Sequence, residues 1–158
     1  MFSIGDMIAH PLHGAGVIDS IESREINGCV RQYYVLKIPI GSMVVMIPTE
    51  TSDMIGVRPI IGCDEAETLI DAIPGIAVEI TSNWSRRYRE NMERLKSGNL
   101  LEVARVIKGL MLRDVERGLS TGDRKMLVSA KQILISELVL SQQTSYEEVE
   151  TRINAAMA

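Results

Sequence analysis

The sequence predicts an α+β fold, in which a small, strongly bent β-sheet or barrel is followed by an all-α domain of about five helices. Over roughly the first fifty residues, short apolar-patterned runs are separated by tight turns, and no helical period is visible. From about Asp64 onward, apolar side chains recur with the 3.6-residue period of amphipathic helices. We therefore expect a β domain over residues 1–55, a linker over residues 56–63 and a helical domain over residues 64–158.

Four or five short strands are expected in the β domain. The dipeptide Asn27-Gly28 lies between two apolar-patterned runs, which is a strong signal for a β-hairpin. After this turn, Tyr34, Leu36 and Ile38 share one face of the next strand. The expected strands lie within residues 2–10, 17–26, 29–38 and 43–48.

The last of these strands is expected at an edge of the sheet. Pro39 precedes it and Pro48 ends it. Because proline has no backbone N–H to donate to a ladder, a strand bracketed in this way fits an edge better than the centre of a sheet.

Five helices are expected in the second domain. Acidic residues open the first, which suits the positive end of a helix dipole. Gly118 stands where the third helix should stop. Ser120 followed by Asp123 resembles a capping arrangement at the start of the fourth, with Asp in place of the usual Glu or Gln. The expected helices lie at about residues 63–73, 82–96, 100–117, 120–140 and 146–156.

The composition is that of an ordinary globular protein. Of 158 residues, 46% are apolar and 24% are charged. No apolar run approaches the roughly 20 residues that span a bilayer, and the N-terminus lacks the basic and apolar regions of a signal peptide. Cys29 and Cys63 have no metal-like spacing. We expect a cytoplasmic protein with two reduced thiols.

Charge is distributed in three blocks along the chain. Residues 1–80 carry four basic and eleven acidic side chains, a net charge of −7. Residues 81–131 carry twelve basic and six acidic ones, a net charge of +6, and residues 132–158 carry a net charge of −3. A basic block between two acidic ones suggests that the middle of the chain meets a polyanion and that the first domain meets something else.

The sequence shows no convincing active site, and we do not expect an enzyme. Gly14 and Gly16 lack the third glycine, the lysine and the helix of a phosphate-binding loop. His10 and His13 could hold a metal together with Asp6, but the proline and glycine around them are typical of a turn. Histidines that cap backbone groups in a loop are the favoured interpretation, and no metal or cofactor is expected.

Residues 82–89, which read SNWSRRYR, place the one tryptophan of the chain beside three arginines. In a helix, Trp84 would share one stripe with Tyr88, Met92 and Leu95, as on the buried face of an amphipathic helix. The charged residues opposite or beside that stripe would be Arg86, Arg87, Arg89 and Glu93. On this interpretation Trp84 belongs to the core, and the chain is a protein–protein adaptor whose basic face binds an acidic protein.

The alternative is that Trp84 contacts nucleic acid. It lies in the first helical turn, where a side chain can protrude past the helix end. Cations continue beyond this helix, and Arg124 and Lys125 open a helix whose first N–H groups can hold phosphate. Arginine suits bidentate phosphate contacts, and a flat indole suits wedging against a base step. No segment has the Asn or Gln spacing of a major-groove reader, so we expect contacts to phosphate and DNA shape.

Several stretches resemble the CarD/CdnL family of bacterial transcription regulators. In the helical part they are NWSRRYRENMERLKSGNLLEVARVIKGLMLRD and ERGLSTGDRKMLVSAKQIL. In the β part they are IGDMIAHPLHGAGVIDSIE, YYVLKIP and GVRPII. The β segments alone are less specific, because transcription-repair coupling factors contain a similar module, but this chain has no helicase motifs and is too short for that protein.

The resemblance implies a Tudor-like RNA polymerase-interacting domain joined to a helical DNA-binding domain. Proteins of this family bind the polymerase β subunit, contact promoter DNA at the upstream edge of the melted bubble and stabilise the open complex. A nucleoid-associated monomer in the cytoplasm, without a membrane partner, is implied with it. The residues that match DNA-facing positions are Trp84 as the wedge, with Arg86, Arg87, Arg89 and Arg124.

The resemblance also implies a polymerase-facing region in the β domain. Strand addition to the β subunit is the implied mode, which agrees with an edge strand. Where some relatives have an arginine in this strand, the chain has Met46, so affinity would rest more on backbone pairing and on packing of Met43 and Met46. The matching positions are Arg24, Met43, Val45, Met46 and Ile47.

Overall fold

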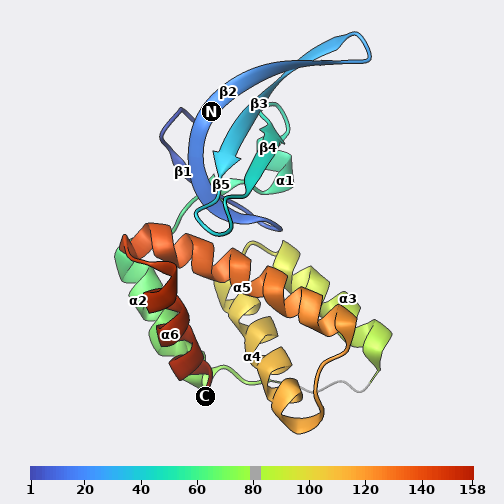
Figure 1. The fold of residues 1–158 in the computed structure, drawn as a ribbon, viewed down its shortest axis with the longest axis vertical. Helices are drawn as coiled ribbons and strands as arrows, with labels where there is room; N and C mark the ends of the chain where they lie inside the picture. Colours follow the sequence, from blue (N-terminus) through green and yellow to red (C-terminus); the bar gives the residue numbers. More distant parts are fainter. Residues whose placement is uncertain (79–82) are drawn as a thin grey trace.

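The structure, a computed structural model, describes residues 1–78 and 83–158, and it joins a β domain to a helical domain as Figure 1 shows. The α+β fold expected from the sequence is confirmed. The strands of the described residues are β1 (Met7–His10), β2 (Gly14–Ile26), β3 (Cys29–Lys37), β4 (Val44–Pro48) and β5 (Arg58–Pro59). The helices are α1 (Ser52–Ile55), α2 (Cys63–Ala72), η1 (Ile73–Gly75), α3 (Trp84–Lys96), α4 (Leu100–Arg117), α5 (Thr121–Gln142) and α6 (Tyr146–Met157). The start that the sequence predicts for the second helix, at residue 82, lies outside the described residues.

The strands form one antiparallel sheet in the order β4-β3-β2-β1-β5. The predicted hairpin is confirmed, because Asn27 and Gly28 join β2 to β3 with φ angles of 52° and 80°. Positive φ at both central residues is what a type I′ hairpin turn requires. This long hairpin projects from the sheet, away from the helices (Figure 1).

The two edge strands of the sheet are β4 and β5. β4 lies at one edge, as its flanking prolines predict. β5 lies at the other edge, where Arg58 and Pro59 pair with Ala9 and Ile8 of β1. The residues expected to be a linker thus contribute a strand to the sheet.

Each domain has its own hydrophobic core. The β core includes the predicted apolar face, because Tyr34 and Leu36 of β3 and Ile38, which directly follows the strand, are all buried. The helical core is larger and draws on α2, α3, α4, α5 and α6. Ile40 packs against both cores, so apolar contact continues from one domain to the other.

Helix α5 lies directly beneath the sheet and joins the two domains (Figure 1). The Ser136 hydroxyl accepts a hydrogen bond from the buried backbone N–H of Ala15 on β2, at 2.8 Å. A Cβ atom at Gly14 would collide with that hydroxyl, so the close approach of β2 to α5 depends on this glycine. The two domains therefore pack as one unit.

None of the helices in the described part of the chain is long and apolar enough to cross a membrane.

Candidate functional site

Trp84 is the first residue of α3 and stands half-exposed at one end of the helical domain. Asn83 caps the helix, because its side-chain oxygen accepts a hydrogen bond from the backbone N–H of Arg86 at 3.1 Å. The indole stacks on the ring of Tyr88, with centroids 5.3 Å apart and planes inclined by 22°. Trp84 nevertheless keeps 46% of its surface exposed. The indole is therefore supported by the protein and still available to a partner.

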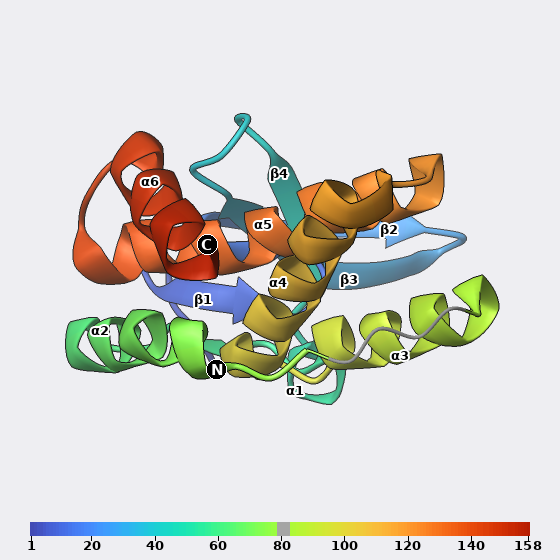
Figure 2. The same ribbon diagram turned by 90° about the horizontal axis from the view of Figure 1, so that it is seen from below.

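The indole also lies against the first turn of α5. A Cβ atom built on Gly122 would be 3.2 Å from Cζ2 of Trp84, which is tighter than most side-chain contacts. Both views place the starts of α3 and α5 at the same end of the helical domain (Figures 1 and 2). Sequence reasoning missed Gly122, since a glycine near a helix start carries no pattern that points to a distant aromatic ring.

The buried face of α3 differs from the stripe that periodicity predicts. Arg87, Asn91 and Leu95 face inward, four residues apart. The prediction that Tyr88 belongs to the core is wrong, because this residue is 40% exposed, and Met92 is only partly buried. The hydrophobic period depends on apolar side chains alone. It therefore does not predict a buried arginine, which faces inward because it forms an ion pair with a carboxylate.

Arg87, which the resemblance matches to a DNA-facing position, is buried in an ion pair. Its Nη2 atom donates to Oδ2 of Asp123 at 3.1 Å, and the two side chains are only 9% and 2% exposed. Nε of Arg113 lies 3.7 Å from the same carboxylate oxygen. Asp123 thus connects α3, α4 and α5, and Arg87 contributes little to the exposed basic surface.

The first turn of α5 carries two further cations. Ser120 caps the helix, as predicted, by accepting a hydrogen bond from the backbone N–H of Asp123 at 3.2 Å. The Asp123 carboxylate is turned toward the arginines instead of completing a capping box. Arg124 and Lys125 follow and are exposed, beside a helix end whose dipole favours anions.

Arg86 and Arg89 are exposed on the outer side of α3. Arg86 forms an exposed ion pair with Glu90, with Nε and Oε1 2.9 Å apart. Such surface pairs contribute little free energy, so a phosphate can replace the carboxylate at small cost. The tryptophan–arginine surface, as we call it, consists of the exposed residues Trp84, Arg86, Arg89, Arg124 and Lys125.

Other cations of the basic block serve the fold. Lys108 donates three hydrogen bonds of 2.9 to 3.0 Å to backbone carbonyls around η1. Arg94 and Arg105 each lie 3.5 Å from the carboxylate of Glu102. The net charge of +6 in this block therefore overstates the number of cations that are available to a polyanion.

The β4 positions that the resemblance matches to a polymerase-facing region divide between the core and the surface. Ile47 is buried in the β core, and Val45 packs against it as a partly buried residue. Met46 and Val44 are exposed, by 36% and 53%. Met43 precedes the strand and is also exposed. The chain thus presents an apolar edge formed by alternate residues, as the pleat of a β-strand dictates.

Some backbone hydrogen-bonding groups of β4 point away from the sheet. Ile38 donates to the carbonyl of Met43 at 2.9 Å, and Thr49 donates to that of Gln32 at 3.0 Å. In an antiparallel ladder, the backbone N–H and C=O groups of successive residues point in alternate directions. Since the backbone groups of Met43 and Thr49 point toward β3, those of the residue after Met43 and the residue before Thr49 point away from it. The positions that point outward are Val44, Met46 and Pro48. The first two direct their N–H groups outward, toward the place of an added strand.

Arg24 lies apart from this edge. It is on β2, near the tip of the hairpin, in register with Arg31 of β3 and 3.1 Å from the carboxylate of Glu22. β4 pairs with a later part of β3 that begins at Tyr33. The structure therefore does not bring Arg24 next to the β4 residues.

The two histidines form a loop contact. Nδ1 of His10 accepts a hydrogen bond from the backbone N–H of Leu12 at 3.1 Å, which agrees with the favoured interpretation of a backbone cap. The His13 ring lies 4.5 Å away, centroid to centroid. Partial burial, and to a lesser degree the neighbouring His13, lowers the pKa of His10 to about 4. In the described residues no three His, Cys, Asp or Glu side chains gather as a metal site.

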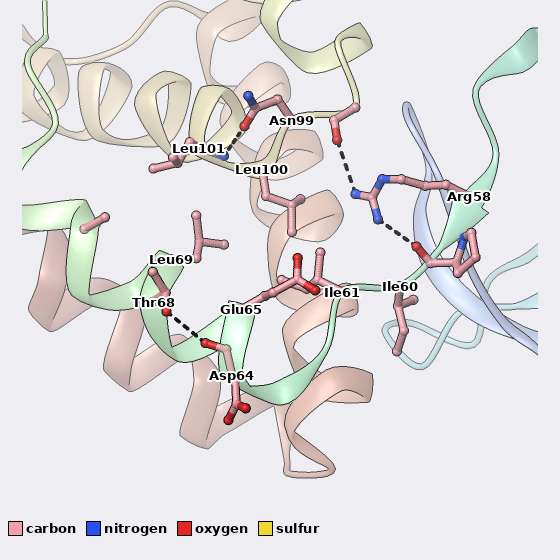
Figure 3. Close-up of a pocket in the computed structure, with 13 residues that line it drawn as sticks. Arg58, Ile60, Ile61, Asp64, Glu65, Thr68, Leu69, Asn99, Leu100 and Leu101 are labelled. Atoms are coloured by element: carbon pink, nitrogen blue, oxygen red, sulfur yellow. Dashed lines mark hydrogen bonds between the residues drawn. The ribbon is translucent and has the colours of Figure 1, made fainter.

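A groove of about 700 Å³ opens at the domain junction, between β5, α2 and the start of α4, and Figure 3 shows its lining. Arg58, at one side of the groove, donates to the Glu137 carboxylate and to the Gly98 carbonyl, whereas two other polar side chains make local contacts. The Asn99 side chain accepts from the N–H of Leu101 at 2.9 Å, and Thr68 donates to the carbonyl of Asp64 at 3.0 Å (Figure 3). The Asn99 contact caps the start of α4, and the Thr68 contact lies within α2.

Comparisons with known proteins match two family models to the chain. Residues 2–61 match the CarD-like/TRCF RID domain, and residues 68–154 match the CarD C-terminal domain. The chain belongs to the CarD family of transcription regulators. It is 33% identical over 151 residues to a Bacillus subtilis (strain 168) protein named "Putative transcription factor YdeB", a match that covers 96% of this chain and 99% of that protein.

Proposed function

We propose that the protein is a non-catalytic transcription regulator that bridges RNA polymerase and promoter DNA. Its β domain binds the polymerase β subunit, and its helical domain contacts DNA at the upstream edge of the melted bubble and stabilises the open complex. The family membership supports a role in transcription, and the family's implied binding modes supply the two partners. The protein acts as a cytoplasmic, nucleoid-associated monomer.

The tryptophan–arginine surface is the observation that carries this proposal. A half-exposed indole lies at a helix start, among arginines that are exposed or only weakly paired. The arginines suit phosphate, and the indole suits stacking on a base at the junction between duplex and bubble. The competing adaptor hypothesis requires a buried structural Trp84, which does not match its exposure of 46%.

The β4 edge supports the polymerase contact. The outward N–H groups of Val44 and Met46 can pair with a strand of the β subunit, and the exposed side chains of the same residues add apolar contact. The two surfaces belong to different domains, so the protein can hold both partners at once.

Open-complex lifetime tests the proposal. Polymerase holoenzyme on a promoter fragment is challenged with heparin, with and without the full chain. We expect the chain to prolong the lifetime and to co-elute with polymerase without DNA. An unchanged lifetime together with no co-elution would refute the bridge.

A further inference from the structure

We propose that Asp123 is a positioning residue for Trp84. It holds the start of α3 against the start of α5, and thereby sets where the indole stands. This inference rests on the proposed function, because it explains how Trp84 is held in the position that a wedge against DNA requires. Arg87 makes no DNA contact on this proposal and acts by positioning Trp84.

The ion pair and the indole contact occupy neighbouring positions on the same two helices. Arg87 follows Trp84 by three residues on α3, which puts the two side chains about one turn apart on adjoining sides of the helix. Asp123 is the residue after Gly122, on which the indole rests. The pair between Arg87 and Asp123, at 3.1 Å, therefore fixes the spacing of the helices where Trp84 packs.

Burial makes the carboxylate necessary. Asp123 is 2% exposed and faces two guanidinium groups, those of Arg87 and Arg113. In the described part of the chain, no hydrogen-bond acceptor reaches Nε or Nη1 of Arg113, so Asp123 is its near counter-charge. Without the carboxylate, two buried cations would repel each other between α3 and α4. The start of α3 would then move away from α5 and take Trp84 with it.

The charge of Asp123 lets experiment separate this role from simple electrostatics. Asp123→Asn removes one negative charge from the basic end of the helical domain, which by itself should strengthen DNA binding. If Asp123 positions Trp84, the substitution should instead weaken the DNA contact. We expect the open-complex lifetime to fall by roughly five- to 150-fold, the range for loss of one aromatic stacking contact.

The test compares the full chain with Trp84→Ala, Asp123→Asn and the double variant, on polymerase holoenzyme and a promoter fragment. If Asp123 acts through Trp84, Asp123→Asn shortens the lifetime alone and has no further effect in the Trp84→Ala background. Asp123→Glu keeps the charge and should restore most of the lifetime. Since Trp84 is the one tryptophan of the chain, its acrylamide quenching reports the indole directly and should rise in Asp123→Asn.

Three outcomes overturn the proposal. The first is that Asp123→Asn leaves the open-complex lifetime unchanged or prolongs it. The second is that Asp123→Asn shortens the lifetime further in the Trp84→Ala background. The third is that acrylamide quenching of Trp84 in Asp123→Asn stays at the native level. If Trp84→Ala itself has no effect, the wedge role fails as well, which distinguishes the two proposals.

A second variant covers the case in which Asp123→Asn does not fold. Asp123→Asn combined with Arg113→Met removes one buried cation along with the carboxylate, and it still breaks the ion pair between Arg87 and Asp123. The same shortened lifetime is expected, and a native lifetime overturns the proposal. Gly122→Ala, which displaces the indole without any charge change, should reproduce the loss with an unchanged salt dependence.

Discussion

Arg58 of β5 and Glu137 of α5 join the two domains through a two-point ion pair, with N–O distances of 2.7 and 2.9 Å. The Glu137 carboxylate is buried and also accepts the backbone N–H of Ile61 at 2.9 Å. The neighbouring Ser136 binds β2 through Ala15. Two consecutive residues of α5 thus hold the sheet at two points, and they fix the position of the β4 edge relative to Trp84.

Arg58→Ala should lower the free energy of unfolding strongly. It leaves the Glu137 carboxylate buried without its cation, a change that typically costs about 3–5 kcal/mol. Urea denaturation measures the loss. The matched control is Arg152→Ala, which breaks an exposed two-point pair with Glu67 and should cost much less. Equal losses in both variants would contradict a special role for the interdomain pair.

Trp84→Ala should shorten the open-complex lifetime while leaving polymerase binding intact. Loss of one aromatic stack costs about 1–3 kcal/mol, which is roughly five- to 150-fold in lifetime. Heparin challenge measures the lifetime, and co-elution measures the polymerase contact. Because Trp84 is half-exposed, a melting temperature close to that of the unchanged chain is expected. A native lifetime would rule out the wedge.

Arg86→Ala combined with Arg89→Ala should weaken DNA binding and flatten its salt dependence. Each lost phosphate contact reduces the slope of log K against log salt concentration by about 0.9. Fluorescence anisotropy with a labelled duplex at several salt concentrations gives this slope. Lys37→Ala serves as the control, since it removes an exposed cation of the β domain that pairs with Asp19. The same change of slope in the control would show that general charge is responsible.

Met46→Pro should weaken polymerase binding, because it removes an N–H group that points outward from β4 and leaves the ladder with β3 intact. One hydrogen bond contributes about 0.5–1.5 kcal/mol, or roughly two- to twelvefold in Kd. Titration of the full chain onto polymerase measures the change. Met46→Thr keeps the N–H group and should retain most of the backbone contribution. If both variants lose affinity equally, side-chain packing and not strand addition supplies the contact.

His10→Asn should reduce the loss of stability in mild acid. The pKa of His10 is lowered to about 4, so between pH 6.5 and pH 4 the unfolded chain binds more protons at this residue than the folded chain. The stabilisation from neutral His10 is therefore lost as the pH falls through this window. Asn can still accept the Leu12 N–H group but does not titrate. Denaturation midpoints compared at pH 7 and pH 5 measure the difference, and equal pH dependence in both proteins would contradict the assignment.

Periodicity and turn chemistry predicted the elements well where the local sequence decides. The Asn27-Gly28 hairpin, the edge position of β4 and the span of α4 are all as expected. These features depend on φ preferences, on a missing N–H group and on capping, which act within a few residues. The sequence by itself therefore determined the order of the elements and the existence of a basic helical module.

The tertiary structure alone decided which charged residues are exposed. Arg86 and Arg87 are adjacent in the sequence, yet one is on the surface and the other is buried against Asp123, 36 residues later. Gly122 likewise gains its importance from an indole on another helix. Whether a cation is available to a partner depends on the carboxylate that folding places beside it, because an arginine can be buried only when its charge is compensated.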